Sequence, residues 1–118
     1  MVESDKQVSG SGTTLPSASH TSDAHVTVSP GRKGAKRYTV RWWLDDGGPG
    51  HFSVLTVFYR TAGGTDSHSV KNRGTGRLKG SFTIRTTSAV KAMWARVERM
   101  DSHESQTTLR ASDPNVFS

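Results

Sequence analysis

Alternation of apolar with polar residues constrains the fold of this chain more than any other feature of its sequence. Within residues 90–112, Met93, Ala95 and Val97 would share one side of an extended segment, with larger or charged residues between them. A period of two is the period of a β-strand, whose successive side chains point to opposite faces. No window of the sequence shows the 3.6-residue period of a helix. The pattern therefore predicts an all-β chain.

Seven strand-like runs follow one another, separated by Gly- and Pro-rich turn clusters. They lie at residues 24–29, 37–44, 51–60, 67–71 and 77–85, with two more inside residues 90–112. Many short strands with such turns between them are typical of a sandwich or barrel, and we expect a β-sandwich of about seven antiparallel strands. The run at 51–60 is apolar on both sides, which predicts a central strand covered on two faces or partly by a partner. The alternation predicts that the inward side chains of the run at 37–44 are Tyr38, Val40, Trp42 and Leu44, and that those of the run at 77–85 are Leu78, Phe82 and Ile84.

Residues 1–23 differ in composition from the rest of the chain. They are rich in Ser, Thr and Gly, as in the stretch SGSGTTLPSASHTSD, and offer few apolar side chains to bury. Such a composition cannot by itself offset the entropy lost when a chain is ordered. We expect residues 1–23 to form a polar N-terminal arm, flexible alone or ordered in an assembly, and residues 24–118 to form the sandwich.

The sequence contains no arrangement of residues that indicates catalysis or metal binding. It has no cysteine, and its five histidines never occur at the short spacings of metal ligands. Asp45 and Asp46 lie in the stretch LDDGGPG, a turn in which aspartate is favoured for its own backbone hydrogen bonds. Residues 74–80 lack the glycine spacing of a dinucleotide-binding loop, and no serine lies in a nucleophile elbow. We expect a non-enzymatic protein without cofactor, catalytic residue or metal site.

Membrane and secretion signals are also missing from the sequence. No stretch is apolar enough to span a bilayer, and the N-terminus MVESDKQVSGSG lacks the apolar region of a signal peptide. We therefore expect no membrane partner and no secretion by a signal peptide. The absence of cysteine fits synthesis in a cytosol.

Several short motifs follow one another in residues 51–112. They are Phe58-Tyr59-Arg60, the turn Ala62-Gly63-Gly64, Leu78 with Phe82 and Ile84, Met93 with Ala95 and Val97, and the run Ser105 to Leu109. In this order they resemble the strands of the immunoglobulin-like and fibronectin type III superfold. Ala95 stands about where immunoglobulin domains carry their second cysteine, and Met93 lies near the place of their corner tyrosine.

This resemblance implies an Ig-like β-sandwich and a structural role. Cysteine-free domains of this kind are common on tailed-phage virions, as head decoration, minor capsid or tail-surface proteins. Others occur in bacterial surface proteins, usually as repeats behind a signal peptide. One short domain with a polar arm is more similar to the virion case. The implied partner is the major capsid protein or a tail protein of the same bacteriophage particle, with self-association through edge strands or the arm as a further possibility.

Two groups of side chains are candidates for partner binding. The first is basic, from clusters at 32–41 and 71–79, and the second is a set of aromatic rings expected to point outward. The candidates are Arg32, Lys33, Lys36, Arg37, Lys71, Arg73, Arg77 and Lys79, with Trp43, Tyr59 and Trp94. A basic surface attracts an acidic protein, nucleic acid or an anionic membrane, and charge alone does not choose among them.

Three other readings of these residues stay open. The cations could form an ordinary solvated face, and arginines at 41, 60 and 96 could cover the rings, or the strand register could differ by one. A carbohydrate- or cell-surface-binding module would use Trp43, Trp94 and the turn 45–51 to stack on sugar. A nucleic-acid-binding protein would need rings for base stacking. Of the aromatic residues beside the first cluster, Tyr38 and Trp42 are expected to point inward, which leaves Trp43 alone for stacking.

Overall fold

The computed structural model describes residues 13–15, 24–101, 107–110 and 116–117, which form an all-β structure without helices. The described strands are β1 (Thr13–Leu15), β2 (Ala24–Ser29), β3 (Arg37–Leu44), β4 (His51–Thr61), β5 (Gly64–Asn72), β6 (Leu78–Arg85), β7 (Ala92–Asp101) and β8 (Thr107–Arg110). The all-β prediction is confirmed. The predicted count of seven strands is not, because the described residues form eight.

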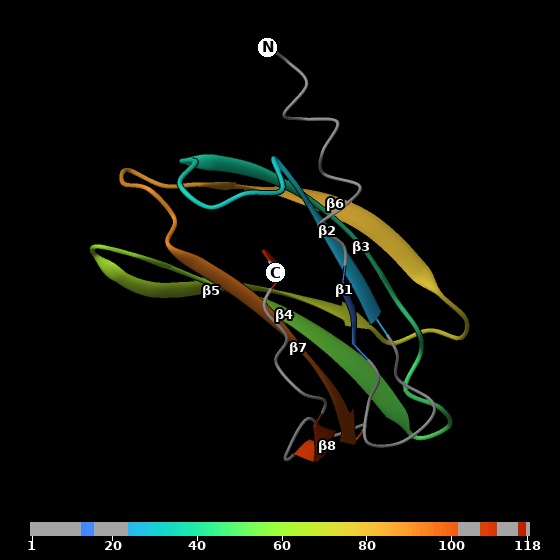
Figure 1. Cartoon of the computed structure of the whole chain (residues 1–118). Helices are drawn as coiled ribbons and strands as arrows, with labels where there is room; N and C mark the ends of the chain where they lie inside the picture. The colour runs from blue at the N-terminus through green and yellow to red at the C-terminus, as the bar shows by residue number, and fades with distance from the viewer. Residues whose placement is uncertain (1–12, 16–23, 102–106, 111–115, 118) are drawn as a thin grey trace.

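The strands form two four-stranded sheets that lie one above the other (Figure 1). Sheet A has the order β1-β2-β3-β6, and sheet B has the order β5-β4-β7-β8. Every neighbouring pair in both sheets is antiparallel. The arrangement is compatible with a β-sandwich.

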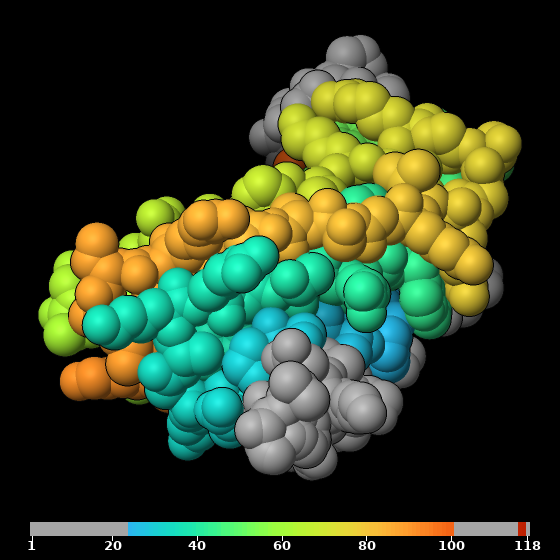
Figure 2. Space-filling model, turned by 90° about the horizontal axis from the view of Figure 1, so that it is seen from above, coloured from blue at the N-terminus to red at the C-terminus, as the bar shows by residue number. Residues whose placement is uncertain are grey.

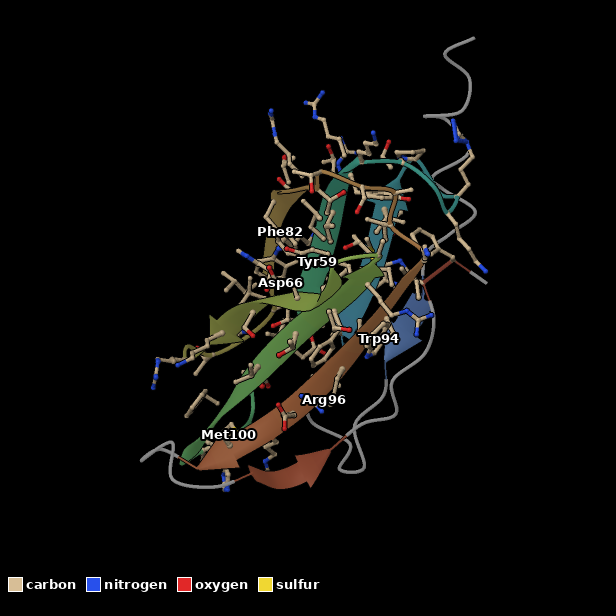
Figure 3. The ribbon with its side chains drawn as sticks, turned by 90° about the vertical axis from the view of Figure 1, so that its left-hand side faces the viewer. Tyr59, Asp66, Phe82, Trp94, Arg96 and Met100 are labelled. Carbon is tan, nitrogen blue, oxygen red and sulfur yellow. The ribbon has the colours of Figure 1, made fainter. Side chains whose placement is uncertain are left out.

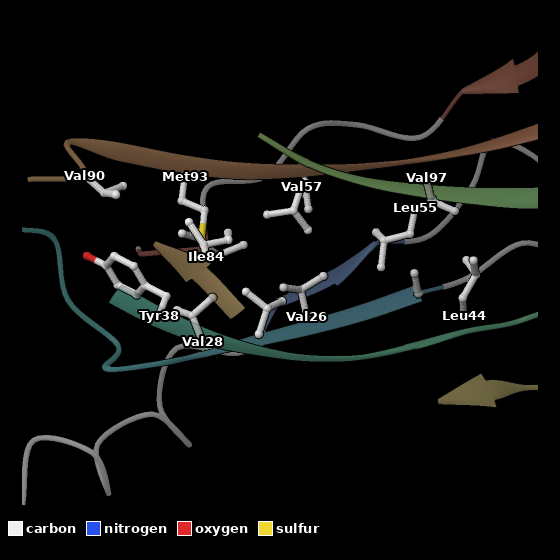
Figure 4. Close-up of a cluster of buried hydrophobic side chains, with 14 residues drawn as sticks. Val26, Val28, Tyr38, Leu44, Leu55, Val57, Ile84, Val90, Met93 and Val97 are labelled. Atoms are coloured by element: carbon white, nitrogen blue, oxygen red, sulfur yellow. The ribbon is translucent and has the colours of Figure 1, made fainter. Parts of the chain in front are cut away.

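The apolar core lies between the two sheets (Figure 4). Alternate residues of the strands supply it: in β2, Ala24, Val26 and Val28 are buried, and the residues between them are half-buried. The sequence alternation therefore puts one row of side chains into the core. Inward positions predicted for several residues of β3 and β7 are confirmed by full burial, namely Tyr38, Val40, Leu44, Met93, Ala95 and Val97.

Strand β4 is buried on both of its faces. Leu55 and Val57 belong to the core between the sheets, whereas Phe52 and Val54 on the opposite face are only 3% and 8% exposed. The strand pairs with β5 on one side and β7 on the other. The prediction of a central strand in this segment is confirmed.

Strands β5 and β6 form the edges of the two sheets on the same side of the molecule. The ring centroids of His68 in β5 and Phe82 in β6 lie 4.0 Å apart, so the two edges meet across the core. Of the β6 residues predicted to point inward, Ile84 is buried, but Leu78 is 42% exposed. An edge strand has one neighbour in its own sheet, so the end of β6 lacks the cover that central strands receive.

At the other edge of sheet A, strand β1 pairs with β2, with Leu15 opposite Ala24. Part of the segment predicted to be an arm, Thr13–Leu15, is therefore a strand of the chain's own sheet. The rest of that predicted arm lies outside the described residues. Ser105, the start of the last predicted run, also lies outside them, and the run is described as β8.

Candidate binding surface

The outer face of sheet A carries positive charge without any carboxylate on its strands. Strand β3 directs Arg37 and Arg41 to this face, and β6 directs Lys79 and Arg85 to it; all four are exposed. Between them lie hydroxyl side chains such as that of Thr83. Strands β1, β2, β3 and β6 contain no Asp or Glu. Figure 2 looks onto this face, with β2 in blue, β3 in green-blue and β6 in yellow-orange side by side.

Three more exposed cations, Arg32, Lys33 and Lys36, lie in the β2–β3 loop at one end of this face. The loop is fixed in place by the buried Tyr38, whose hydroxyl donates to the Arg32 carbonyl at 2.7 Å and accepts from the Ala35 amide at 3.1 Å. Burial raises the pKa of Tyr38 above 10.0, so the phenol stays protonated and can donate at neutral pH.

Main-chain bonds tie the same loop to the β6–β7 connection. The Gly34 amide donates to the Val90 carbonyl at 2.9 Å, and the Val90 amide donates to the Ala35 carbonyl at 3.0 Å. These two main-chain bonds and the two bonds of the Tyr38 hydroxyl fix the backbone of the loop relative to the sheet. We call the seven exposed cations of the loop and the sheet the basic surface: Arg32, Lys33, Lys36, Arg37, Arg41, Lys79 and Arg85.

Two cations of the basic surface face each other directly. Arg37 and Arg85 are register partners on neighbouring strands, and both are exposed. Like charges in directly opposite positions of a sheet destabilise it. No cation of the basic surface forms an ion pair with a carboxylate in the described part of the chain. The repulsion is therefore uncompensated within that part, and a bound anion would relieve it.

The structure divides the second predicted basic cluster between two faces. Lys79 lies on the basic surface, opposite Trp43. Arg77 forms an ion pair with Asp45, with 2.8 Å between Nε and Oδ1, and its guanidinium lies 3.6 Å from the centre of the Trp43 ring. Lys71 and Arg73 instead pack against the ring of Phe52 on sheet B, 5.8 and 4.3 Å from its centroid. The two predicted clusters therefore do not form one continuous basic patch.

The three rings predicted to share an outward face do not do so. Trp43 lies on the outer side of sheet A, stacked against His25 with 5.9 Å between ring centroids. Trp94 lies on the outer side of sheet B, stacked on Phe58 at 5.5 Å. Tyr59 points to the inner side and packs against the core. Trp43 and Trp94 thus point outward as predicted, but from different sheets. The prediction is wrong for Tyr59, because β4 is apolar on both sides and its alternation does not distinguish inner from outer.

Tyr59 has a polar partner at the edge of the core. Its hydroxyl donates a hydrogen bond to the carboxylate of Asp66, which is the opposite residue on β5. Burial, followed by the charge of Asp66 and this hydrogen bond, raises the pKa of Tyr59 above its usual value of 10.0. The phenol therefore remains a donor at neutral pH. Figure 3 labels both residues and shows them close together at one end of β4 and β5.

The outer face of sheet B differs from the basic surface because several of its cations lie over aromatic rings. Phe58 and Trp94 stack there, and the guanidinium of Arg96 covers Phe58 at 4.8 Å from the ring centroid. Arg96 also lies 3.8 Å from the carboxylate of Glu98, measured from Nε to Oε1. Trp94, Arg96 and Met100 follow one another along this side of β7 (Figure 3). On this face Arg96 is paired with Glu98, and cations lie over the rings of Phe58 and Phe52.

Three exposed cations at the loop end were not among the predicted site residues. They are Arg60, Arg85 and Lys91, and the Lys91 amide donates to the Arg60 carbonyl at 2.7 Å. The alternation of residues 77–85 already indicates that Arg85 points outward. Its place beside Arg37 depends on the pairing of β3 with β6, which is a long-range contact that sequence periodicity does not determine.

Within the described ranges, no group of three or more His, Cys, Asp and Glu side chains is arranged to hold a metal ion. The same residues include no helix long and apolar enough to cross a membrane. No protein-family model, curated protein or solved structure matches the chain.

Proposed function

We propose that this protein is a non-enzymatic Ig-like β-sandwich that attaches to a larger assembly by docking its basic surface on an acidic protein surface. The observation that carries the proposal is the uncompensated charge of sheet A, above all the directly opposed Arg37 and Arg85. Such an arrangement costs stability in the free chain and becomes favourable when a partner supplies negative charge.

The strand orders support the Ig-like assignment. Immunoglobulin-type sandwiches place their second and fifth strands in one sheet and their third, sixth and seventh strands in the other. If β2 is taken as the first strand, β3 and β6 lie together in sheet A, and β4, β7 and β8 lie together in sheet B. Strand β5 would then be the additional strand beside β4, and β1 an extension of the sheet.

An acidic protein is favoured over nucleic acid by the surroundings of Trp43. Binding of single-stranded nucleic acid uses aromatic rings with a free face for base stacking. The ring of Trp43 is covered by the Arg77 guanidinium and stacked against His25. The basic surface thus offers charge and hydroxyls without an open stacking platform, which suits carboxylates on a protein surface.

The assembly that we propose is a bacteriophage particle, with the protein as a head decoration or minor capsid protein and the tail surface as the second location. The motif resemblance supports this choice. A particle presents many identical copies of its capsid protein, so weak electrostatic contacts would add through multivalency. The carbohydrate-binding alternative in which Trp43 and Trp94 form one platform is not favoured, since the two rings lie on opposite outer faces.

The experiment is to isolate particles from cells that carry the gene and to measure the copy number of this protein on them by quantitative mass spectrometry. We expect many copies per particle, and about a tenfold or greater loss of occupancy when Arg32, Lys33 and Lys36 are all replaced by Glu. Replacement of Ser67, Ser69 and Ala62 by Glu introduces the same number of carboxylates away from the basic surface and leaves its cations in place, so it should retain occupancy. Absence from the particle fraction, or equal loss in both variants, contradicts the proposal.

A salt titration distinguishes the two kinds of anionic partner. Binding to DNA or RNA would fall steeply with salt, with a log–log slope set by the number of phosphates contacted. We expect no measurable binding of the purified chain to either polymer above physiological ionic strength. Tight binding to nucleic acid under those conditions, lost in the triple Glu variant, would replace the acidic protein by nucleic acid as the partner.

A further inference from the structure

A second candidate site adjoins the basic surface, with which it shares Arg85, and lies between the β4–β5 turn and the end of β6. It is an open depression of about 350 Å³, lined on one side by Tyr59, Thr65 and Asp66 and on the other by Arg85 and Thr86. The volume lies at the lower end of the range for small-molecule sites in proteins. The depression lies where the edges of the two sheets meet. Its walls come from β4, β5 and the turn between them, and from the end of β6.

The walls offer opposite hydrogen-bonding capacity. Asp66 accepts from the Ser67 amide at 2.8 Å and from the Tyr59 hydroxyl, which leaves part of the carboxylate free to accept from a ligand. Across the depression, the exposed Arg85 offers donors and forms no ion pair with Asp66 or another carboxylate in the described part of the chain. Asp66 lies in β5 and Arg85 lies in β6, so the backbone of each residue is part of a strand.

These two walls select among ligand chemistries. A simple anion would be repelled by Asp66, a simple cation would be repelled by Arg85, and an apolar ligand would displace water from both without replacing its hydrogen bonds. A neutral ligand with several hydroxyl groups satisfies both walls, because each hydroxyl can donate to the carboxylate and accept from the guanidinium. The half-buried ring of Tyr59 adds a small apolar surface of the kind that a sugar ring can contact.

We propose that the depression between Tyr59, Asp66 and Arg85 binds a neutral sugar residue of a glycan. Asp66 accepts from sugar hydroxyls, Arg85 donates to them, and Tyr59 fixes the carboxylate and contacts the ring. The site shares Arg85 with the basic surface but contains none of the loop cations Arg32, Lys33 and Lys36, so sugar binding is tested on the free chain, apart from docking to an assembly.

The test is a glycan array of neutral and sialylated oligosaccharides, followed by titration of the best neutral binder while amide NMR shifts are recorded. We expect a neutral glycan to bind and to shift amides of residues 61–66 and 85–87. Asp66→Ala should weaken this binding about tenfold or more, because a charge-assisted hydrogen bond is lost. Thr83→Ala, which alters an exposed residue of β6 that does not line the depression, should leave the affinity unchanged.

Retained folding of each variant is checked by its thermal unfolding midpoint, and Asp66→Asn gives a second, smaller change that keeps an acceptor. No binding of any neutral glycan at millimolar concentration contradicts the proposal, as does binding that Asp66→Ala and Asp66→Asn leave intact. Preference for sialylated glycans, or for a peptide strand that shifts the whole of β5, would also overturn it. Particle occupancy of Asp66→Ala should match that of the natural chain, so failure here and failure of docking are distinguishable.

Discussion

The outer faces of the two sheets differ in the surroundings of their charged side chains. On sheet B, Phe52 and Val54 are almost fully buried, Arg96 lies over Phe58 and beside Glu98, and cations cover apolar rings. Sheet A presents exposed arginine and lysine side chains, hydroxyls and no carboxylate on its strands. Cations on sheet B such as Arg96 lie over rings or beside a carboxylate, whereas sheet A places Arg37 directly opposite Arg85, an arrangement that costs stability.

Among the substitutions that compare the two faces, we expect Phe52→Ala to cause the largest loss in the free energy of unfolding. Replacing this ring by Ala removes a side chain that is 3% exposed and packed under Arg73, and we expect a loss of about 3 kcal/mol in the free energy of unfolding. Arg41→Ala on the opposite sheet should change it by less than about 0.5 kcal/mol. Urea unfolding of both variants measures the contrast, and similar losses would show that the two faces are equivalent.

A second contrast lies within β6, between its inner and outer residues. A Cβ atom at Gly80 would lie 2.6 Å from Cζ2 of the Trp42 ring, so Gly80→Ala forces the ring to move and should cost roughly 1–3 kcal/mol. Ser81→Ala, one residue on and exposed, should be nearly neutral. Thermal unfolding measures both. Equal tolerance at the two positions would mean that β6 has a different register against β3.

Tyr38→Phe tests the link between the core and the basic loop. The change removes two hydrogen bonds and leaves the Arg32 carbonyl and Ala35 amide without them, so we expect a loss of about 1–3 kcal/mol. Amide hydrogen exchange should rise in residues 32–36 and remain unchanged in β7. Exchange that is unaltered in the loop would show that Tyr38 does not hold it.

The same residue predicts a dependence on alkaline pH. The pKa of Tyr38 is raised above 10.0 in the folded chain, chiefly by burial, so the folded state holds its proton more tightly than the unfolded state. Its contribution to stability is complete below about pH 10 and is lost as the pH rises through the folded pKa. The decline in unfolding free energy above pH 10 should therefore be shallower in Tyr38→Phe, and an equally steep decline would contradict this assignment.

The sequence was sufficient for the all-β class and for much of the core, but it assigned the strand Thr13–Leu15 to an arm. Alternation in β3 and β7 identified Tyr38, Leu44 and Met93 as buried, because one face of each strand is clearly more apolar than the other. The same reasoning failed for Tyr59. Its strand is covered on both faces, so a period of two carries no information on which face is inner.

The candidate sites depended on contacts that no local pattern specifies. Arg37 and Arg85 become neighbours through the pairing of β3 with β6, and the depression joins β4, β5 and β6. Lys71 and Arg73 are close to Lys79 in sequence, yet they lie against Phe52 on the other sheet. Charge clusters in the sequence thus predicted the presence of cations but not the face on which they act.

The most direct test of uncompensated charge on sheet A is a double-mutant cycle on Arg37→Ser and Arg85→Ser, measured by urea unfolding at low and high salt. We predict that either single change stabilises the chain and that the second adds less. The two arginines should show a repulsive coupling of roughly 0.2–1 kcal/mol at low salt. Screening should reduce this coupling at high salt. A coupling that is zero or attractive, and that salt does not change, would contradict the account.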